Sequence, residues 1–353
     1  MTEREITVSQ AIREVQQFIL QTHPESVIVG LNAASPAGMF ETMTGLVSEF
    51  GSDRVVESPA SEAAVTGIAL GMASAGLRPI VIHQRVDFAI LAMDQMVNQV
   101  AKWHFMYGGK FKAPMIIRMI VGRGWGQGPQ HSQALHAWFA HTPGLRVIFS
   151  SFPRESMNSF YWSFLDDAPV IFIEHRWMHL VKGLVEESAP KPELLPSMVR
   201  RRGSKVTLVG VSFMTVECLS AARLLESREI DAEVIDILAL TPLDVTQVVE
   251  SLQETGRLLV CDIGVCEFGV SAEIVAKVLS LVNSNVPVMT RRLGLPSVPT
   301  PSAPEASAVF YPTAVSIANA VLDMFAVSEK LWFSETRPPH ELDVPNSRFL
   351  GPY

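Results

Sequence analysis

The sequence predicts an α/β protein of two doubly wound domains, each built on a mainly parallel sheet. Short runs of Val and Ile, bounded by turn residues, alternate with helical patterns along the chain. Such runs are typical of parallel strands that helices cover on both faces. The 353 residues suffice for about two domains, and a hydrophobic content of 48% supplies a large core.

The first half of the chain shows this alternation from its beginning. Apolar residues between positions 8 and 19 recur at helical spacing, so a helix should open the chain. A helix rich in alanine and glycine is expected over 61–74, and a longer helix over 89–106. Strands are expected at 27–31, 54–58, 78–83, 113–121, 146–150 and 168–175.

A change of composition separates the two halves. Residues 184–204 contain three prolines and mixed charge, which is typical of a linker. Beyond them the alternation resumes, with helices expected at 215–228, 244–255, 269–282 and near 312–326. We therefore expect a first domain over 1–190, a linker over 191–204, a second domain over 205–330 and an irregular tail over 331–353.

Charge and cysteine content exclude several classes of function. With 36 acidic against 28 basic residues the net charge is −8, and nucleic-acid binding is not expected. The low share of charged residues, 18%, favours an oligomer. Three cysteines without a CxxC pair indicate a reducing compartment, and no apolar run approaches the ~20 residues that a membrane span needs. The polar N-terminus is unlike a presequence, so we expect a cytoplasmic protein.

Glu62 stands between a strand and the helix rich in small residues. Taken alone, an acid in the first helical turn most often only complements the helix dipole. The alternative is a carboxyl group that faces a ligand, since open α/β folds bind ligands at the carboxyl end of the sheet.

A glycine-rich loop follows the strand at 113–121. Its glycines, at every second position from 122 to 128, would let the backbone approach a ligand closely. The spacing matches neither a dinucleotide-binding fingerprint nor a Walker A loop. His131 closes this loop. A lone histidine is more often structural, but at the end of such a loop a functional role is about as well supported.

A third polar cluster follows the strand at 78–83. His83, Gln84, Arg85 and Asp87 gather where a buried strand ends, and polar groups there are costly without partners. Phe88 follows them and fits either the core or a platform for stacking.

Longer segments carry a family resemblance. The chain contains, in this order, ESPASE, DFAILAMDQMVNQVAKW, PQHSQ and APVIFIEH, and its second half contains TLVGVSFMTVECLSAARLL and LPSVPTPSAPE. In these segments it resembles the β subunit of thiamine-diphosphate-dependent 2-oxo acid dehydrogenases, the decarboxylating components of the transketolase superfamily. The resemblance implies a pyrimidine-binding transketolase-like domain followed by a transketolase C-terminal-like domain.

The resemblance also implies a heteromeric enzyme. In this family the β subunit supplies the aminopyrimidine half of the thiamine diphosphate site, and an α subunit holds the diphosphate and Mg²⁺ through a GDG motif. No GDG occurs in this sequence, which fits a β subunit that needs an α partner. The resemblance implies an α₂β₂ heterotetramer.

Individual residues take their implied roles from the same resemblance. Glu62 matches the glutamate that hydrogen-bonds the pyrimidine ring and activates the cofactor. For this role its carboxyl group must stay protonated, which requires that it be withdrawn from water. Phe88 matches the aromatic that stacks on the pyrimidine, and Gln84 a residue lining the same pocket. His131 matches a histidine that donates a proton or hydrogen bond to the substrate. Asp166 falls where some relatives wrap a monovalent cation such as K⁺.

The sequence departs from the family in segments beside the implied pocket. HQRVDF replaces a more apolar stretch, EHRWMH follows another strand, and GLNAASP lacks the acids of the usual turn. These departures predict a substrate more polar or anionic than pyruvate, with His83 or Arg85 as recognition groups.

The implied reaction is decarboxylation of a 2-oxo acid. The acyl or hydroxyalkyl unit would pass to the lipoyl group of an acyltransferase or to another acceptor. Two alternatives stay open: half of a split transketolase or related carboligase, and a non-catalytic scaffold or regulatory subunit.

Overall fold

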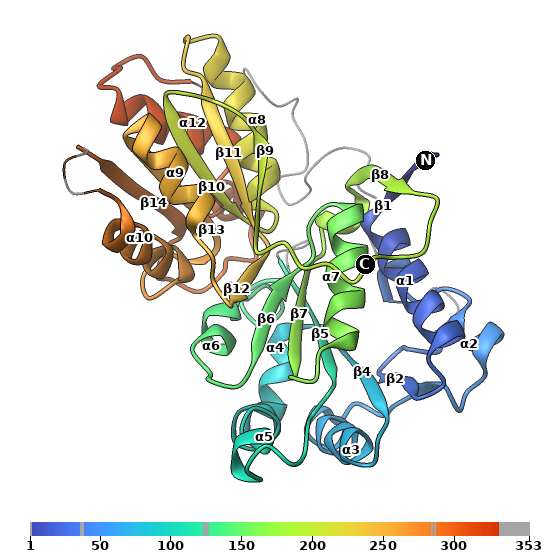
Figure 1. Ribbon diagram of the computed structural model, residues 1–353. Helices are drawn as coiled ribbons and strands as arrows, with labels where there is room; N and C mark the ends of the chain where they lie inside the picture. Colours follow the sequence, from blue (N-terminus) through green and yellow to red (C-terminus); the bar gives the residue numbers. More distant parts are fainter. Residues whose placement is uncertain (1, 36–38, 123–126, 284, 286, 332–353) are drawn as a thin grey trace. The chain divides into compact units, whose positions relative to one another are not determined.

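Two compact units make up the chain in a computed structural model (Figure 1). The structure describes residues 2–35, 39–122, 127–283, 285 and 287–331. The first unit contains the chain up to Gly122 together with Trp138–Leu195. The second contains residues 127–137 together with the chain from Pro196 on. The prediction of a two-domain α/β fold with mainly parallel sheets is confirmed, and segment 127–137 clusters with the second unit although it lies early in the sequence.

The described strands of the first unit's main sheet are all parallel and lie in the order β6-β7-β5-β4-β2-β3. They are short runs of Val and Ile because helices cover both faces of the sheet. Their bounds are β2 (Ser26–Gly30), β3 (Val55–Glu57), β4 (Arg78–His83), β5 (Ile116–Val121), β6 (Arg146–Phe149) and β7 (Val170–His175).

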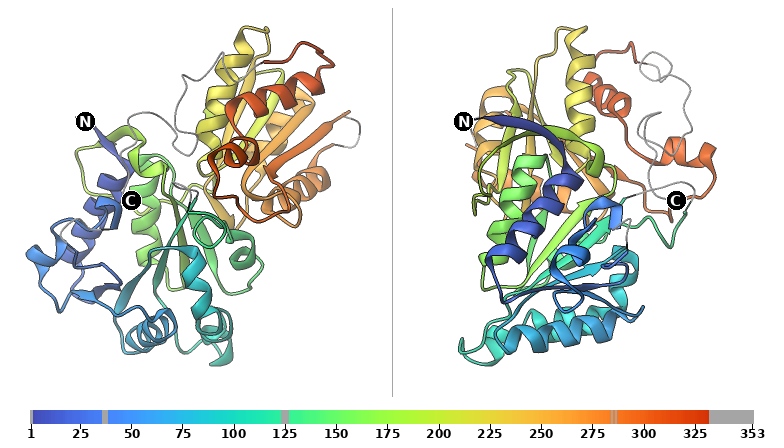
Figure 2. Two further views of the ribbon diagram at one scale, coloured as in Figure 1. Left: turned by 180° about the vertical axis from the view of Figure 1, so that it is seen from behind. Right: turned by 90° about the vertical axis from the view of Figure 1, so that its right-hand side faces the viewer.

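Helices connect these strands by crossovers that place them on both faces of the sheet. On one face α1 packs beside α7, as both views of Figure 2 show. On the other face α3 packs against η2 and η3. The bounds are α1 (Val8–Thr22), η1 (Met39–Glu41), α2 (Leu46–Phe50), α3 (Glu62–Ser74), α4 (Val86–Ala89), η2 (Ile90–Ala92), η3 (Asp94–Val100), α5 (Trp103–Met106), α6 (His136–Ala140), α7 (Pro153–Leu165) and η4 (Met178–Leu180).

The helix expected over 89–106 is broken into short pieces. Its middle part, η3, is a π-helix, and its beginning, η2, is a 3₁₀ turn. Helical sequence periodicity does not distinguish these windings, which local packing decides. Such π segments are frequent beside functional sites, and this one lies next to α3.

A separate two-stranded ribbon completes the first unit. β1 (Glu3–Thr7) pairs antiparallel with β8 (Lys182–Glu186). β1 leads directly into α1, whose cap Thr7 accepts a hydrogen bond from the Gln10 backbone amide at its hydroxyl, while the Thr7 backbone amide donates to the Gln10 side-chain oxygen. This capping box fixes where α1 begins.

The second unit has its own sheet, with strand order β14-β13-β10-β11-β9. β9 runs antiparallel to β11, and the other described neighbours are parallel. The segment 191–204, predicted as a linker, contains β9, because an antiparallel edge strand can be polar and still pair. The bounds of these five strands are β9 (Ser197–Arg201), β10 (Val206–Val211), β11 (Ala232–Ile237), β13 (Arg257–Val265) and β14 (Met289–Leu295). The short strand β12 (Ala239–Thr241) is not part of this sheet.

Helices cover both faces of this second sheet as well. α8 and α12 pack together, and α9 contacts α10. The bounds are α8 (Met214–Glu226), α9 (Thr246–Thr255), α10 (Val270–Leu281), α11 (Pro304–Phe310) and α12 (Ala314–Met324). Cys218 and Cys261 are free and buried, and Cys266 is free and half-buried. Within the described ranges no helix has the length and apolarity to traverse a bilayer. Of the predicted irregular tail over 331–353, all but Leu331 lies outside the described residues.

Candidate active site

A cavity of about 100 Å³ opens at the carboxyl end of the first unit's sheet. Open parallel sheets bind ligands at this edge, because the loops that follow the strands converge there. The lining comes from the ends of β2 and β4, the turn before α3, the first turns of α3, and α4. The lining residues are Leu31, Ser58, Pro59, Ala60, Ser61, Glu62, Val65, Ile82, His83, Gln84 and Phe88.

Glu62 lies at the first position of α3 and lines this cavity. Its side chain is half-buried, and within the described part of the chain no hydrogen bond or ion pair holds its carboxylate. The carboxyl group is therefore available to a ligand. The single chain achieves only part of the withdrawal from water that the predicted role requires.

A backbone hydrogen bond joins the turn before α3 to the end of β2. The Ser58 amide donates to the Gly30 carbonyl over 3.1 Å. A side chain at Gly30 would lie 2.6 Å from the Ile82 carbonyl oxygen, so only glycine lets β2 and β4 pass this closely. The Glu57 carboxylate accepts the amides of Asn32 and Ala34 at 2.7 and 2.9 Å and thereby orders the loop after β2.

His83 ends β4 and lines the cavity with a ring that is almost fully buried. Its Nε2 lies 3.0 Å from the Thr66 hydroxyl on α3. Burial lowers the pKa of His83 to about 4, so the ring is neutral at physiological pH. As a recognition group it would therefore act through a hydrogen bond rather than through positive charge.

Gln84 and Phe88 also reach the cavity. The Gln84 amide donates to the Leu31 carbonyl over 3.3 Å and so joins the ends of β4 and β2. Phe88 is 38% exposed and presents part of its ring to the cavity. The predicted cluster of Glu62, Gln84, His83 and Phe88 thus shares one cavity, while their roles toward a ligand stay predictions.

Arg85 does not line the cavity. It is buried, and its Nη1 donates to the Gly122 carbonyl over 3.2 Å at the end of β5. The arginine therefore supports the beginning of the glycine-rich loop. Its predicted contact with a substrate stays a prediction. Residues 123–126 of this loop lie outside the described residues.

His131 belongs to the segment that clusters with the second unit. Its ring is half-buried, and its amide donates to the Gly128 carbonyl over 3.4 Å. Its proposed action on a substrate stays a prediction.

Two buried charged clusters escaped the sequence analysis. In the first unit, Arg118 on β5 donates to both carboxylate oxygens of Glu174 on β7, at 2.6 and 2.9 Å. In the second unit, His136 Nε2 lies 2.9 Å from Asp262 Oδ1 on β13. Neither pair has a recognisable sequence spacing. The sequence indicated them only through charged residues inside otherwise apolar strands.

The cation site predicted at Asp166 stays a prediction, and the structure shows which groups of the chain lie beside this residue. The Asp166 carboxylate forms an ion pair with Arg146. Arg78 Nη1 donates to the carbonyls of Phe164 and Asp166 at 2.7 and 3.1 Å, and its Nη2 donates to Asp167 at 2.9 Å. Guanidinium groups of the chain itself therefore contact several oxygens of the segment 164–167. Within the described ranges, no group of three or more His, Cys, Asp or Glu side chains could hold a metal ion.

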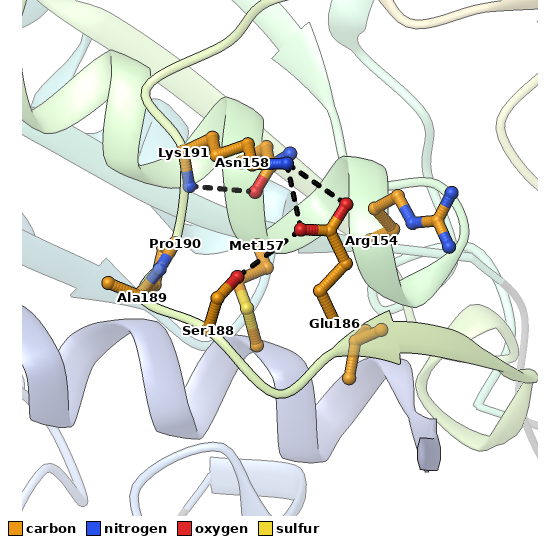
Figure 3. Close-up of a pocket in the computed structure, with 9 residues that line it drawn as sticks. Arg154, Met157, Asn158, Glu186, Ser188, Ala189, Pro190 and Lys191 are labelled. Carbon is orange, nitrogen blue, oxygen red and sulfur yellow. Dashed lines mark hydrogen bonds and ion pairs between the residues drawn. The ribbon is translucent and has the colours of Figure 1, made fainter. Parts of the chain in front are cut away.

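A second cavity, of about 20 Å³, lies between α7 and the segment after β8 (Figure 3). Two of its charged groups pair, since Lys191 Nζ donates to both Glu186 oxygens at 2.9 and 2.8 Å. The Lys191 amide donates to the Asn158 side chain over 3.1 Å. These contacts fasten the segment after β8 to α7.

Both units match known family models. Residues 4–179 match the model described as transketolase, pyrimidine binding domain. Residues 197–317 match the model described as transketolase, C-terminal domain.

Curated proteins of known name align with most of the chain. The acetoin:2,6-dichlorophenolindophenol oxidoreductase subunit beta of Cupriavidus necator is 32% identical over 327 residues, covering 90% of this chain and 96% of that protein. The protein of the same name from Bacillus subtilis is 32% identical over 333 residues, covering 91% and 97%. The pyruvate dehydrogenase E1 component subunit beta of Rickettsia bellii is 32% identical over 317 residues, covering 90% and 98%.

A solved structure shares the fold. The chain titled "Split gene transketolase, inactive beta4 tetramer" superposes with a TM-score of 0.72 at 22% identity, covering 92% of this chain and 99% of that one.

Proposed function

The chain belongs to the transketolase-like family of thiamine-diphosphate-dependent E1 β subunits, and from this premise we propose its reaction. We propose that, with an α subunit, it decarboxylates a 2-oxo acid and passes the acyl or hydroxyalkyl unit to a lipoyl group or another acceptor. The compartment we propose is the cytoplasm, in keeping with its cysteine usage.

The observation that carries this proposal is the cavity that Glu62 and Phe88 share. A carboxyl group without a protein partner and a partly exposed aromatic ring fit a flat, nitrogen-containing ring such as an aminopyrimidine. The neutral His83 and the amide of Gln84 add hydrogen-bonding groups to the same wall. The residues present therefore suit the pyrimidine half of thiamine diphosphate.

Each residue has a defined task in this proposal. Thiamine diphosphate, when bound, supplies the electron sink for the electron pair that a departing carboxylate leaves behind. Glu62 holds a proton toward a ring nitrogen, Phe88 orients the ring by stacking, and His131 donates a proton or hydrogen bond to the substrate. Val65 and Ile82 keep water from the inner wall of the cavity.

An exposed face of the first unit supports the proposal that a partner subunit binds. α3 presents Gly67, Ile68 and Gly71 to solvent, and η2 adds Leu91, which is 66% exposed. A side chain at Gly71 would meet no atom within 4 Å, so another helix could approach this backbone closely. α3 begins at the half-buried Glu62. An α subunit covering this face would thus also withdraw Glu62 from water and could bring the Mg²⁺ and diphosphate site, in an α₂β₂ assembly.

The names of the relatives support a second candidate substrate. Two of them are named for acetoin, a neutral hydroxyketone, whereas the third is named for pyruvate. Cleavage of a hydroxyketone would use the same cavity. A neutral His83 suits either substrate as a hydrogen-bond partner.

The test is the chain co-expressed with an α subunit that carries the GDG motif. We expect the complex to bind thiamine diphosphate and to turn over pyruvate, acetoin or a more polar 2-oxo acid. Glu62→Gln should lower kcat by about 10²- to 10⁴-fold, because a proton-transferring group is lost. Glu49→Gln, which removes an acid from the first turn of α2, outside the cavity, is the matched control.

The outcomes separate the candidates. Product from a ketose and an aldose without a lipoyl acceptor would favour the split-transketolase alternative. A complex that binds no thiamine diphosphate would favour the scaffold alternative and contradict the proposal.

A further inference from the structure

We propose that His136 and Asp262 form a buried anchor that positions His131. The two residues lie in the second unit, His136 at the start of α6 and Asp262 within β13. Only the role of His131 toward a substrate rests on the function proposed above. The anchor itself concerns how the segment 127–137 is held.

The anchor is a fully buried imidazole–carboxylate pair. His136 Nε2 lies 2.9 Å from Asp262 Oδ1, with the two side chains 1% and 0% exposed. The same Asp262 oxygen accepts the Gly264 amide at 3.1 Å. A carboxylate in this setting is costly unless it is hydrogen-bonded, so removing the His136 donor would leave a strongly unfavourable group behind.

Close backbone packing fixes the segment at the same place. A Cβ at Gly264 would lie 2.8 Å from His136 Cε1 and 3.5 Å from the Ala134 carbonyl. No side chain can therefore stand between β13 and the segment. The strand and the segment are therefore in direct contact beside the hydrogen-bonded pair.

A second contact lies on the other side of His131. A Cβ at Gly128 would lie 2.2 Å from the Ser302 hydroxyl, and Gly128 has a φ of +65° that favours glycine. The neighbouring Ser132 is 3% exposed. His131 thus stands between two points, Gly128 and His136, at which the segment is held against the second unit.

This arrangement makes His136 and Asp262 positioning residues. A proton donor must reach its acceptor within a narrow distance, and a misplacement of about 1 Å can cost about 100-fold in rate. A half-buried side chain on a loop gains such precision from supports that are themselves rigid. The buried pair supplies this support from within the sheet.

The test compares His136→Ala with His136→Gln in the complex with the α subunit. Gln carries an amide nitrogen near the position of Nε2, so it keeps a donor for Asp262. We expect His136→Ala to accelerate amide hydrogen exchange over 128–136 at least about tenfold and to lower kcat by about 10- to 100-fold. The dissociation constant of thiamine diphosphate should stay unchanged, because the cavity residues are intact. His136→Gln should restore both exchange protection and kcat.

The matched control is His179→Ala. It breaks another buried imidazole–carboxylate pair of the same length, 2.9 Å to Glu174, in the first unit. A general loss of stability would affect both variants, whereas the anchor predicts faster exchange over 128–136 only for His136→Ala. Exchange in His136→Ala that equals the wild type, or failure of His136→Gln to restore it, would overturn the anchor.

Failure of the proposed function would be seen separately. Amide hydrogen exchange can be measured without turnover. If the wild-type complex is inactive but His136→Ala still accelerates exchange over 128–136, the anchor is supported and the proposed reaction is contradicted. Turnover that His136→Ala leaves unchanged, despite faster exchange, would overturn the link to His131.

Discussion

Two buried carboxylates, one in each unit, face the same kind of partner but are compensated differently. Glu174 in the first unit and Asp262 in the second each lie 2.9 Å from a histidine Nε2. Glu174 also receives two hydrogen bonds from Arg118. Asp262 receives only the Gly264 amide in addition, and its Oδ2 has no hydrogen-bond partner among the described residues. Full compensation suits a structural brace, whereas an incompletely compensated carboxylate depends more strongly on each partner that it keeps.

The Glu174 cluster connects distant parts of the first unit. Arg118 also donates to Gln16 on α1 and to Thr42 in the loop before α2, at 2.8 and 2.9 Å. Burial alone would raise the pKa of Glu174, but Arg118 and the hydrogen bond from His179 lower it to about 2. The carboxylate is therefore ionised at all physiological pH values and holds this part of the fold together.

The largest expected effect comes from removing the compensation of Glu174. Arg118→Met leaves this carboxylate with His179 alone and so makes it resemble Asp262. We expect the free energy of unfolding to fall by about 3 to 5 kcal/mol, because a buried charge loses its main partner. Urea unfolding measures this loss, with the exposed Arg223→Met as control. A fall in the free energy of unfolding of less than about 1 kcal/mol would contradict the proposed difference between the two carboxylates.

A second, smaller effect concerns a buried histidine without a carboxylate partner. His83 has a pKa of about 4 in the folded chain, against 6.5 for an ordinary histidine. Between these values the unfolded chain binds a proton that the folded chain does not. The free energy of unfolding should therefore fall as the pH falls through this interval, by up to about 3 kcal/mol.

His83→Gln keeps a polar group toward Thr66 and removes this titration. Urea unfolding at several pH values should show a flatter profile for His83→Gln than for the wild type. Identical profiles would contradict the assignment of the slope to His83.

A third effect tests whether Arg78 takes the place of a cation. Arg78→Ala removes the guanidinium from the carbonyls at the end of α7 and should cost about 2 kcal/mol, since hydrogen bonds from a charged donor are lost at a partly exposed site. The wild-type melting temperature should not change when K⁺ replaces Na⁺ at equal ionic strength. Lys110→Ala, a change at an exposed position, is the control. Stabilisation of the wild type by K⁺ would support the cation-site prediction.

The smallest effect is expected at Asp262. Asp262→Asn keeps an oxygen for His136 and Gly264, and its amide nitrogen takes the place of an oxygen that lacks a hydrogen-bond partner among the described residues. The free energy of unfolding should fall by about 1 kcal/mol or less. A loss as large as that of Arg118→Met would show that the two carboxylates are equivalent.

The sequence predicted the fold well where residue pattern determines structure. Runs of Val and Ile become strands, and Glu62 begins the helix rich in small residues, so its meeting with the end of β4 follows from parallel topology. The polar strand β9 was missed because the apolar pattern does not identify an antiparallel edge. His136 and Asp262 could not be paired, since 126 positions separate them and only the folded sheet brings them together.

The solvent-facing side of α3 and η2 has a consequence for the cell. Gly67, Ile68 and Leu91 form an exposed apolar area in the single chain, and the proposed α subunit would cover it. Surplus copies would meet chaperones and proteases with this area exposed, and their lifetime would be short. Matched synthesis of the two gene products would then set how much enzyme accumulates, independently of how fast each copy works.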